Sequence, residues 1–359
     1  ALGYRLSKLS FRLIDRTNGH QHYPAVAMLA GSSVDWKVEP LMSVAETHLL
    51  GSTKGNQVGD TVYTEMNLLM YITNLFLCGK NLNFVRGQFL AAAGKLYKNK
   101  QKLALHQASA VARAAVDFIG GVDSRDYGRE SPFQPPTWNA LGDDPQMKGA
   151  LDASFVYFSH HYMRSMLLTR DFSDLPSNGL LARIASRKKT MRIIFAVGVF
   201  YEGLSSFFLA RRHSHQHCEV GMRALDFISM YSQANPYTFE NKHLLLKAML
   251  QQLSNSPEAG ATFLASISSA RQNKFIVEEG LACEMASYYF FSRGDADKSH
   301  TLKRHAAICY NEWGGLAVAR RVDAEIRDIF GGDRLDNNEI IVERSRSNGN
   351  INPKKRQQA

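Results

Sequence analysis

The densest group of side chains that could bind a metal is a histidine-rich segment near the middle of the chain. His213, His215, His217 and Cys218 follow one another closely, and imidazole nitrogens and a thiolate are ligands that zinc and copper accept. However, the alternating spacing of these residues is typical of a loop between helices, and no Cys-x-x-Cys pair accompanies them. The sequence therefore favours a solvated loop, with a metal site at these four residues as the weaker alternative.

Two further pairs of adjacent titratable residues invite a chemical interpretation. His160 and His161 fall within a predicted helix, so we expect one ring in the core and the other in solvent. Glu278 and Glu279 could be taken for a catalytic carboxylate pair, but adjacent residues on a helix point about 100° apart. Two acidic residues near a helix start more simply complement the helix dipole.

The four cysteines are scattered and form no Cys-x-x-Cys motif: Cys78, Cys218, Cys283 and Cys309. Neither a disulfide framework nor a structural zinc module is indicated, and a reducing, cytoplasmic location is the default. We expect Cys78, Cys283 and Cys309 to serve as small core residues.

Catalytic motifs can be searched for directly. A P-loop requires G-x-x-x-x-G-K-[ST] so that backbone amides cradle phosphate, whereas Gly79-Lys80 and Gly94-Lys95 lack both the earlier glycine and the following hydroxyl residue. The sequence also contains no G-x-S-x-G, H-E-x-x-H, H-R-D or G-x-G-x-x-G motif. We therefore assign no catalytic or cofactor-binding residue and predict that this segment is not an enzyme.

Composition and charge narrow the functional classes to which the protein could belong. The 359 residues carry 43 Lys+Arg against 33 Asp+Glu, a formal charge of +10, and 45% are hydrophobic, which is enough for a large core. The positive charge is mostly dispersed and no nucleic-acid-binding module accompanies it, so nucleic-acid binding is disfavoured.

The most apolar run, from Ile193 to Tyr201, is far shorter than the ~20 residues that span a bilayer, so no membrane span is predicted. Because the chain opens on Ala1 in an amphipathic helix, we expect it to be a segment of a longer polypeptide.

Hydrophobic periodicity predicts one helix after another, separated by short turns. In the first helix Leu2, Leu6, Leu9 and Leu13 share a stripe, with arginines outside it. We expect a loop at 51–60. The predicted helices cover 1–16, 25–36, 40–50, 61–78, 82–98, 101–119, 147–168, 176–187, 190–212, 217–233, 240–254, 257–272, 275–292, 297–313 and 315–330.

One long interruption divides the chain. Residues 120–146 are rich in glycine, proline and polar residues and too long for an ordinary connection. We predict an N-terminal helical half at 1–119, a loop insertion or joint at 120–146, a C-terminal helical half at 147–330 and a disordered polar tail at 331–359.

The helices come in pairs, most clearly in the segment FFSRGDADKS at 290–299. This turn resembles the elbow of a tetratricopeptide repeat (TPR), in which Gly294 ends the first helix and Asp295 begins the second. Phe290, Ala306 and Trp313 fall at positions where we expect packing in a helix-pair junction. Three residues depart from the repeat pattern: Ser287, Ser299 and Lys303.

Longer stretches extend the resemblance. GYRLSKLSFRLIDR near the start, GDTVYTEMNLLMYITNLFLCGKNL from Gly59 and EEGLACEMASYYFFSRGDADKSHTLKRHAAICYNEWGG from Glu278 resemble the TPR-like region of large multidomain signalling proteins. In that family a protein-kinase-like domain and a P-loop ATPase precede the helical region, and GAF sensors with a histidine kinase or cyclase output commonly follow. The resemblance implies a helical array without an active site.

Together these features predict an all-α fold, a TPR-like α-solenoid of stacked helix pairs. We expect a non-catalytic interaction and coupling segment of an intracellular signalling protein, which holds a peptide or a neighbouring domain of the same polypeptide on its concave face. The alternative is a free-standing helical enzyme or small-molecule-binding bundle, with 120–146 as a lid over a pocket lined by Tyr157 and Tyr162.

Overall fold

The computed structural model describes residues 2–98, 102–120, 159–172, 192–211 and 215–331. Within these residues every regular element is a helix, which confirms the predicted all-α class. Residues 121–146 of the predicted joint, the predicted helix at 176–187 and residues 332–359 of the predicted tail lie outside the described residues.

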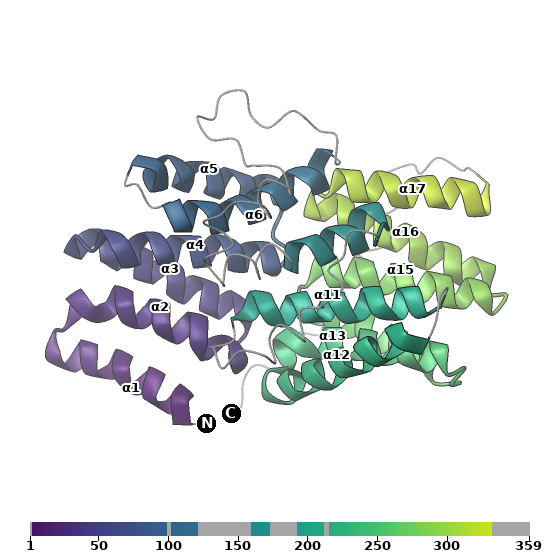
Figure 1. The fold of residues 1–359 in the computed structure, drawn as a ribbon, viewed down its shortest axis with the longest axis horizontal. Coiled ribbons are helices and arrows are strands. Elements are labelled where there is room, and N and C mark those ends of the chain that lie inside the picture. The colour runs from purple at the N-terminus through teal and green to yellow at the C-terminus, as the bar shows by residue number, and fades with distance from the viewer. Residues whose placement is uncertain (1, 99–101, 121–158, 173–191, 212–214, 332–359) are drawn as a thin grey trace, which may run out of the picture.

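The helices form two stacks that lie side by side (Figure 1). The first stack contains α1 (Leu2–Thr17), α2 (Tyr23–Ser33), α3 (Leu41–Val58), α4 (Thr61–Leu77), α5 (Leu82–Lys98) and α6 (Lys102–Gly120). The second stack contains α11 (Ile193–Ala210), α12 (His215–Ala234), α13 (Pro236–Leu253), α14 (Ala259–Gln272), α15 (Ile276–Ser292), α16 (Ala296–Trp313) and α17 (Leu316–Phe330). Short 3-10 turns η1 (His20–His22) and η2 (Asp35–Lys37) flank α2, and a π-helical turn η3 (Ser165–Thr169) ends the segment between the stacks.

Each helix packs against its neighbour in sequence. In addition, α2, α4 and α6 contact one another in series, as do α11, α13 and α15. Contacts with the nearest and next-nearest helix are the pattern of a helical repeat array. The last helix, α17, also packs against α6, so the top of the second stack meets the top of the first (Figure 1).

Local sequence explains where the helices start and stop. Asp60 and Asp295 accept hydrogen bonds at 3.0 and 3.1 Å from backbone N–H groups in the first turns of α4 and α16, as N-cap residues do. Gly79, Gly294 and Gly314 follow helix ends with φ between 69° and 85°, a conformation that costs glycine little. Repeated caps and left-handed glycines thus produce the succession of helical hairpins.

The structure has a helix-turn-helix at the predicted elbow, with the turn between α15 and α16. Gly294 has φ 82° after α15, and Asp295 caps α16. Ala306 and Trp313 are fully buried. Phe290 is only half-buried at the edge of the core, because it lies next to the turn that joins α15 and α16.

The loop predicted at 51–60 is wrong, because α3 continues through Gly51 and Gly55 to Val58. These glycines lie where two helices approach closely. A Cβ on Gly51 would come within 2.8 Å of the Ala27 Cβ and 2.9 Å of the Asn67 side chain. Glycine here serves helix packing, and the sequence pattern of a loop is misleading.

The leucine stripe on α1 exists, but it does not face the core. The side of α1 that packs toward α2 carries Ser7, Phe11 and Ile14. The four leucines lie on the outer side and are 49 to 71% exposed: Leu2, Leu6, Leu9 and Leu13.

Turns from the two stacks meet along a line that we call the turn seam. Asn235, at the start of α13, donates hydrogen bonds to the backbone oxygens of Trp36 at 2.8 Å and Glu39 at 2.6 Å. One layer higher, Asn81, before α5, donates to the backbone oxygen of Glu312 at the end of α16, at 3.1 Å. The seam therefore joins residues about two hundred positions apart.

One large hydrophobic cluster runs through both stacks, and a small separate cluster of Ile14, Tyr23 and Ala27 lies between α1 and α2. Trp36 stacks on Tyr231 of α12 with ring centroids 5.1 Å apart, and Trp313 lies 5.1 Å from Phe118 of α6. By length and composition α11 could cross a membrane, yet 89% of that window is buried within the protein. In this fold α11 is therefore a core helix.

Candidate functional site

The structure describes only part of the histidine-rich segment. His213 lies outside the described residues, and α12 already begins at His215. The solvated loop predicted for this segment is therefore wrong from His215 onward. His217 and Cys218 are half-buried in the first turn of α12, where Cys218 packs against the core.

Both histidines of the 160–161 pair are buried, which corrects the prediction that one would be exposed. The reason is the position of their segment between the two stacks. The His160 ring lies edge-on to Phe76 of α4, with centroids 5.2 Å apart, and neither ring nitrogen has a hydrogen-bond partner among the described residues. Burial lowers the pKa of His160 to about 3, so the ring is neutral at pH 7.

Glu278 and Glu279 lie in the first turn of α15 as predicted, but they are buried and ion-paired. Glu278 is 2.9 Å from the Lys242 ammonium of α13. Glu279 is 2.9 Å from Arg271 of α14. Adjacent carboxylates thus bind different helices, which is a structural arrangement and not a catalytic pair.

One group offers three kinds of metal ligand. Glu279 lies 2.7 Å from His305 Nε2, and Cys309 is close to both. Arg271 fills the position of a cation, however, since its guanidinium contacts both the Glu279 carboxylate and, at 3.0 Å, His305 Nε2. Burial would raise the pKa of Glu279, but the hydrogen bonds from His305 and Arg271 outweigh it and lower that pKa. These polar contacts hold α14, α15 and α16 together.

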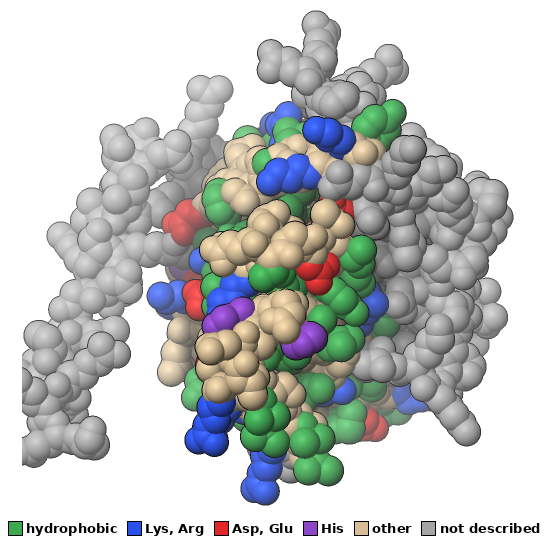
Figure 2. All heavy atoms as spheres, turned by 90° about the vertical axis from the view of Figure 1, so that its left-hand side faces the viewer, with side chains coloured by type: hydrophobic (Ala, Val, Ile, Leu, Met, Phe, Trp, Pro, Cys, Tyr) green, Lys and Arg blue, Asp and Glu red, His purple; other side chains and the backbone are tan. Residues whose placement is uncertain are grey.

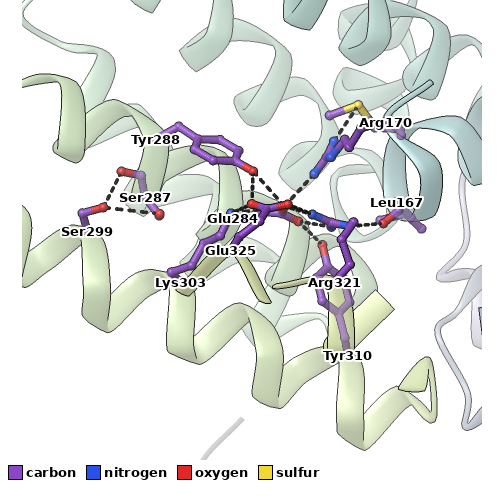
Figure 3. Close-up of polar contacts among 11 residues, drawn as sticks. Leu167, Arg170, Glu284, Ser287, Tyr288, Ser299, Lys303, Tyr310, Arg321 and Glu325 are labelled. Carbon is purple, nitrogen blue, oxygen red and sulfur yellow. Dashed lines mark hydrogen bonds and ion pairs between the residues drawn. The ribbon is translucent and has the colours of Figure 1, made fainter. Parts of the chain in front are cut away.

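The largest polar cluster in the described part surrounds Glu284, in the middle of α15 (Figure 3). Arg321 of α17 binds both carboxylate oxygens of Glu284, at 2.7 and 2.9 Å. Arg170, which follows η3, lies 2.7 Å away, and Lys303 of α16 lies 3.4 Å away. Tyr310 donates to the second oxygen at 3.1 Å. We call this cluster, together with Glu325 and Tyr288, the Glu284 network.

Charge balance in the Glu284 network explains how a carboxylate is kept ionised in the core. Burial alone would raise the pKa of Glu284, but the charges of Arg170, Arg321 and Lys303 hold that pKa well below its usual value. Burial next to the Glu284 and Glu325 carboxylates raises the pKa of Tyr288. At neutral pH the Glu284 carboxylate is therefore ionised and the Tyr288 phenol is neutral.

The Glu284 network ties the segment between the stacks to the last three helices. Arg321 also donates through Nε to the backbone oxygen of Leu167 at 3.0 Å. On the other side of the segment, Arg164 lies 3.1 Å from the buried carboxylate of Asp117 on α6. Ion pairs therefore connect the second stack to the first through this segment.

Sequence reasoning missed the Glu284 network, although its signal was present. Lys303 occupies a position where the TPR pattern has an aromatic residue, and Ser287 and Ser299 replace small residues. In the structure Lys303 contacts Glu284, and Ser299 donates to the backbone oxygen of Ser287 at 2.8 Å. Departures from the repeat pattern thus mark the buried polar residues.

A cavity of about 130 Å³ opens along the turn seam. It is lined by the starts of α3 and α13 and by the turns that precede α5 and α15. Lys80 and Lys274 border it, and Cys78 forms part of its wall. Burial raises the pKa of the Cys78 thiol to about 12, so this thiol is protonated and a poor nucleophile at pH 7.

The outer face of α1 presents the longest run of exposed leucines in the described part. In Figure 2, green hydrophobic side chains and blue Lys and Arg side chains gather along the lower edge, where α1 lies. Singly exposed apolar residues are common, but a contiguous apolar stripe on a surface helix is typical of an interaction site.

Comparison with known proteins adds no assignment: no family model, no curated protein and no solved structure matches this chain.

Proposed function

We propose that the chain is a non-catalytic, TPR-like helical-repeat segment that binds a protein or a neighbouring domain and couples this contact to the rest of a larger intracellular signalling protein. The observation that carries the proposal is the turn seam. Hydrogen bonds from Asn235 and Asn81 join the two stacks at two levels, and a shared core fills the space between them. A displacement of one stack is therefore transmitted to the other through these contacts between described residues.

Repeat geometry supports the TPR-like part of the proposal. The turns after α14 and α16 correspond in backbone conformation, since Lys274 has φ 62° and Gly314 has φ 85°. These turns lie in the segments SARQNKFIVEEG (269–280) and ICYNEWGGLAVA (308–319). Helical arrays of this kind offer extended binding surfaces. Because the turn seam covers one end of each hairpin, we place the binding surface on the outer helices.

The rival proposal, an enzyme or small-molecule-binding bundle, receives less support. Tyr162, proposed to line its pocket, is buried and donates to Glu202 at 3.4 Å, while Tyr157 lies outside the described residues. The cavity at the turn seam, about 130 Å³, is smaller than the several hundred Å³ usual for ligand pockets.

Site-specific photo-cross-linking tests the proposal. A photoreactive residue at Leu9 on α1, and in a separate protein at Leu264 on α14, would be activated in the cells that make this protein. Each cross-linked protein or domain would then be purified and titrated against the purified chain. We expect saturable binding of an identified partner. Small-molecule turnover by the purified chain that a point substitution abolishes, with no saturable partner, would overturn the proposal.

A further inference from the structure

The exposed stripe on α1 has a regular spacing. Leu2, Leu6, Leu9 and Leu13 follow one another at intervals of four, three and four residues. This is the spacing of a and d positions in a coiled coil, where one helix packs lengthwise against another. The stripe is exposed along its whole length, from 71% at Leu2 to 49% at Leu13. Its geometry thus suits a second helix.

The two flanks of the stripe differ in charge. Arg5 and Arg12 lie along one side, at equivalent heptad positions, and neither has an ion-pair partner among the described residues. Gly3 and Ser10 lie along the other side, where the Ser10 hydroxyl donates to the backbone oxygen of Leu6. One flank is therefore basic and free, and the other is neutral.

Two other basic residues lie on α1: Arg16, exposed, follows Leu13 by three residues at the C-terminal end of the stripe, and Lys8 is already engaged. Lys8 lies 2.5 Å from Glu39 and 3.3 Å from Asp35, both on or beside η2. These ion pairs, with the hydrogen bond from Tyr4 to Glu39 at 2.8 Å, fix how α1 rotates on α2. The leucine stripe and its basic flank are consequently held outward.

We propose that α1 docks an amphipathic helix of a partner protein, one with an apolar seam of the same spacing and acidic residues on the side that meets Arg5 and Arg12. The inference rests on the proposed interaction function and names the chemistry of the partner. Acidic residues at flanking heptad positions would form interhelical ion pairs with these arginines.

Two other occupants fit the α1 face less well. A second copy of the chain would place Arg5 near Arg12 of its partner in an antiparallel pair, or near Ser10 in a parallel pair, so the arginines would meet repulsion or no acid. An anionic bilayer would meet both flanks of the stripe equally, whereas of the two flanks only the one with Arg5 and Arg12 is basic.

Binding of three synthetic helical peptides to the full chain tests the inference. The peptides share one leucine seam and carry glutamate, glutamine or lysine on the flank. Fluorescence anisotropy at about 50 mM salt should show the glutamate peptide binding at least about tenfold more tightly than the lysine peptide, with the difference shrinking at about 500 mM salt.

Paired variants identify the surface responsible. Arg5→Glu combined with Arg12→Glu should reverse the peptide preference, and Leu6→Asn combined with Leu13→Asn should abolish binding. Matched controls at exposed residues of α12 in the second stack, Arg223→Glu or Met222→Asn, should change neither. Because all these side chains are exposed, each variant should retain the circular dichroism spectrum and melting temperature of the parent.

Several results would overturn the inference. Equal affinity for the three peptides, or an unchanged preference after charge reversal, would rule out a partner helix with acidic residues opposite Arg5 and Arg12. Dimerisation in sedimentation that Leu6→Asn abolishes, without glutamate-peptide binding, would assign the face to a second copy. Phosphatidylserine vesicle binding with no peptide binding would assign it to a membrane. If a photo-cross-linked partner binds the α1 variants normally, this inference fails while the proposed function stands.

Discussion

At the scale of single residues, Glu284 tests whether the buried charges are interdependent. Glu284→Gln would leave Arg170, Arg321 and Lys303 gathered in the core, with Glu325 as the one carboxylate among the described residues that is paired with two of them. Removing one partner of a buried ion pair typically costs 3 to 5 kcal/mol. We expect a loss of about that size in the free energy of unfolding measured by urea titration.

Glu219→Gln, at an exposed residue of α12, is the matched control and should change stability by less than about 0.5 kcal/mol. Equal stability of the two variants would show that the cations around Glu284 are neutralised by solvent.

Acid sensitivity provides a second test of Glu284. Its folded pKa is depressed, so its contribution to stability is fully present above the unfolded value of about 4.3 and is lost as pH falls from there toward the folded pKa. Urea titrations between pH 5 and pH 3 should therefore show a steeper loss of unfolding free energy in the parent than in Glu284→Gln. Parallel curves would contradict this assignment.

We expect His160 to affect the free energy of unfolding over a different pH range from Glu284. Its pKa of about 3 in the folded protein lies below the unfolded value of about 6.5, so its neutral form stabilises the fold above pH 6.5 and this contribution is lost as pH falls toward 3. His160→Leu should flatten the decline in stability between pH 6.5 and 5 by up to about 1.4 kcal/mol per pH unit. The exposed His20→Leu should leave the slope unchanged, and an equal effect of both substitutions would place His160 in solvent.

At the scale of helices, Gly51 tests the close contact between α2, α3 and α4. Alanine in a helix is normally favoured over glycine by 0.5 to 1 kcal/mol. At Gly51, however, the new Cβ would meet Ala27 and Asn67 at under 3.0 Å, so we expect Gly51→Ala to destabilise the protein by about 1 to 3 kcal/mol. Gly87→Ala on α5, whose Cβ would meet nothing within 4 Å, should instead stabilise it. Stabilisation by both substitutions in thermal unfolding would show that α3 does not approach its neighbours so closely.

The same helices show which features of the fold were predictable from sequence. Periodicity located α4, and local turn chemistry located Gly294 and Asp295, because these signals depend only on nearby residues. Gly51 misled the analysis, since glycine has the same signature in a loop and in a tight helix contact. The direction of the α1 stripe could not be predicted either, because the contacts of Lys8 with Asp35 and Glu39, and not the leucines, fix how α1 sits on α2.

The candidate sites were less predictable than the fold for a similar reason. Glu284 and Arg170 are far apart in sequence and meet because the segment that ends at η3 packs against α11 and α17. The Asn235 side chain, likewise, gives no local sign that it bonds to Trp36 and Glu39. Contacts of this range depend on tertiary structure, which a periodicity analysis does not contain.

At the scale of the whole molecule, Asn235 tests the turn seam. Asn235→Asp keeps a good N-cap for α13 but replaces the amide donor with a carboxylate facing the backbone oxygens of Trp36 and Glu39. We expect a loss of at least about 1 to 3 kcal/mol in urea unfolding, whereas Asp295→Asn, which changes a cap away from the seam, should cost less than about 1 kcal/mol. Similar losses for the two variants would indicate that capping alone explains the role of Asn235.

Cooperativity between the stacks is the central claim, because a segment that couples its contacts must open as one unit. Native-state hydrogen exchange in rising urea measures the opening free energy of each helix separately. We predict that the most protected amides of α4 in the first stack and of α15 in the second converge on one opening free energy and one urea dependence. Exchange of one stack at low urea while the other stays protected would contradict the account, because it would show two independent helical domains joined by a tether.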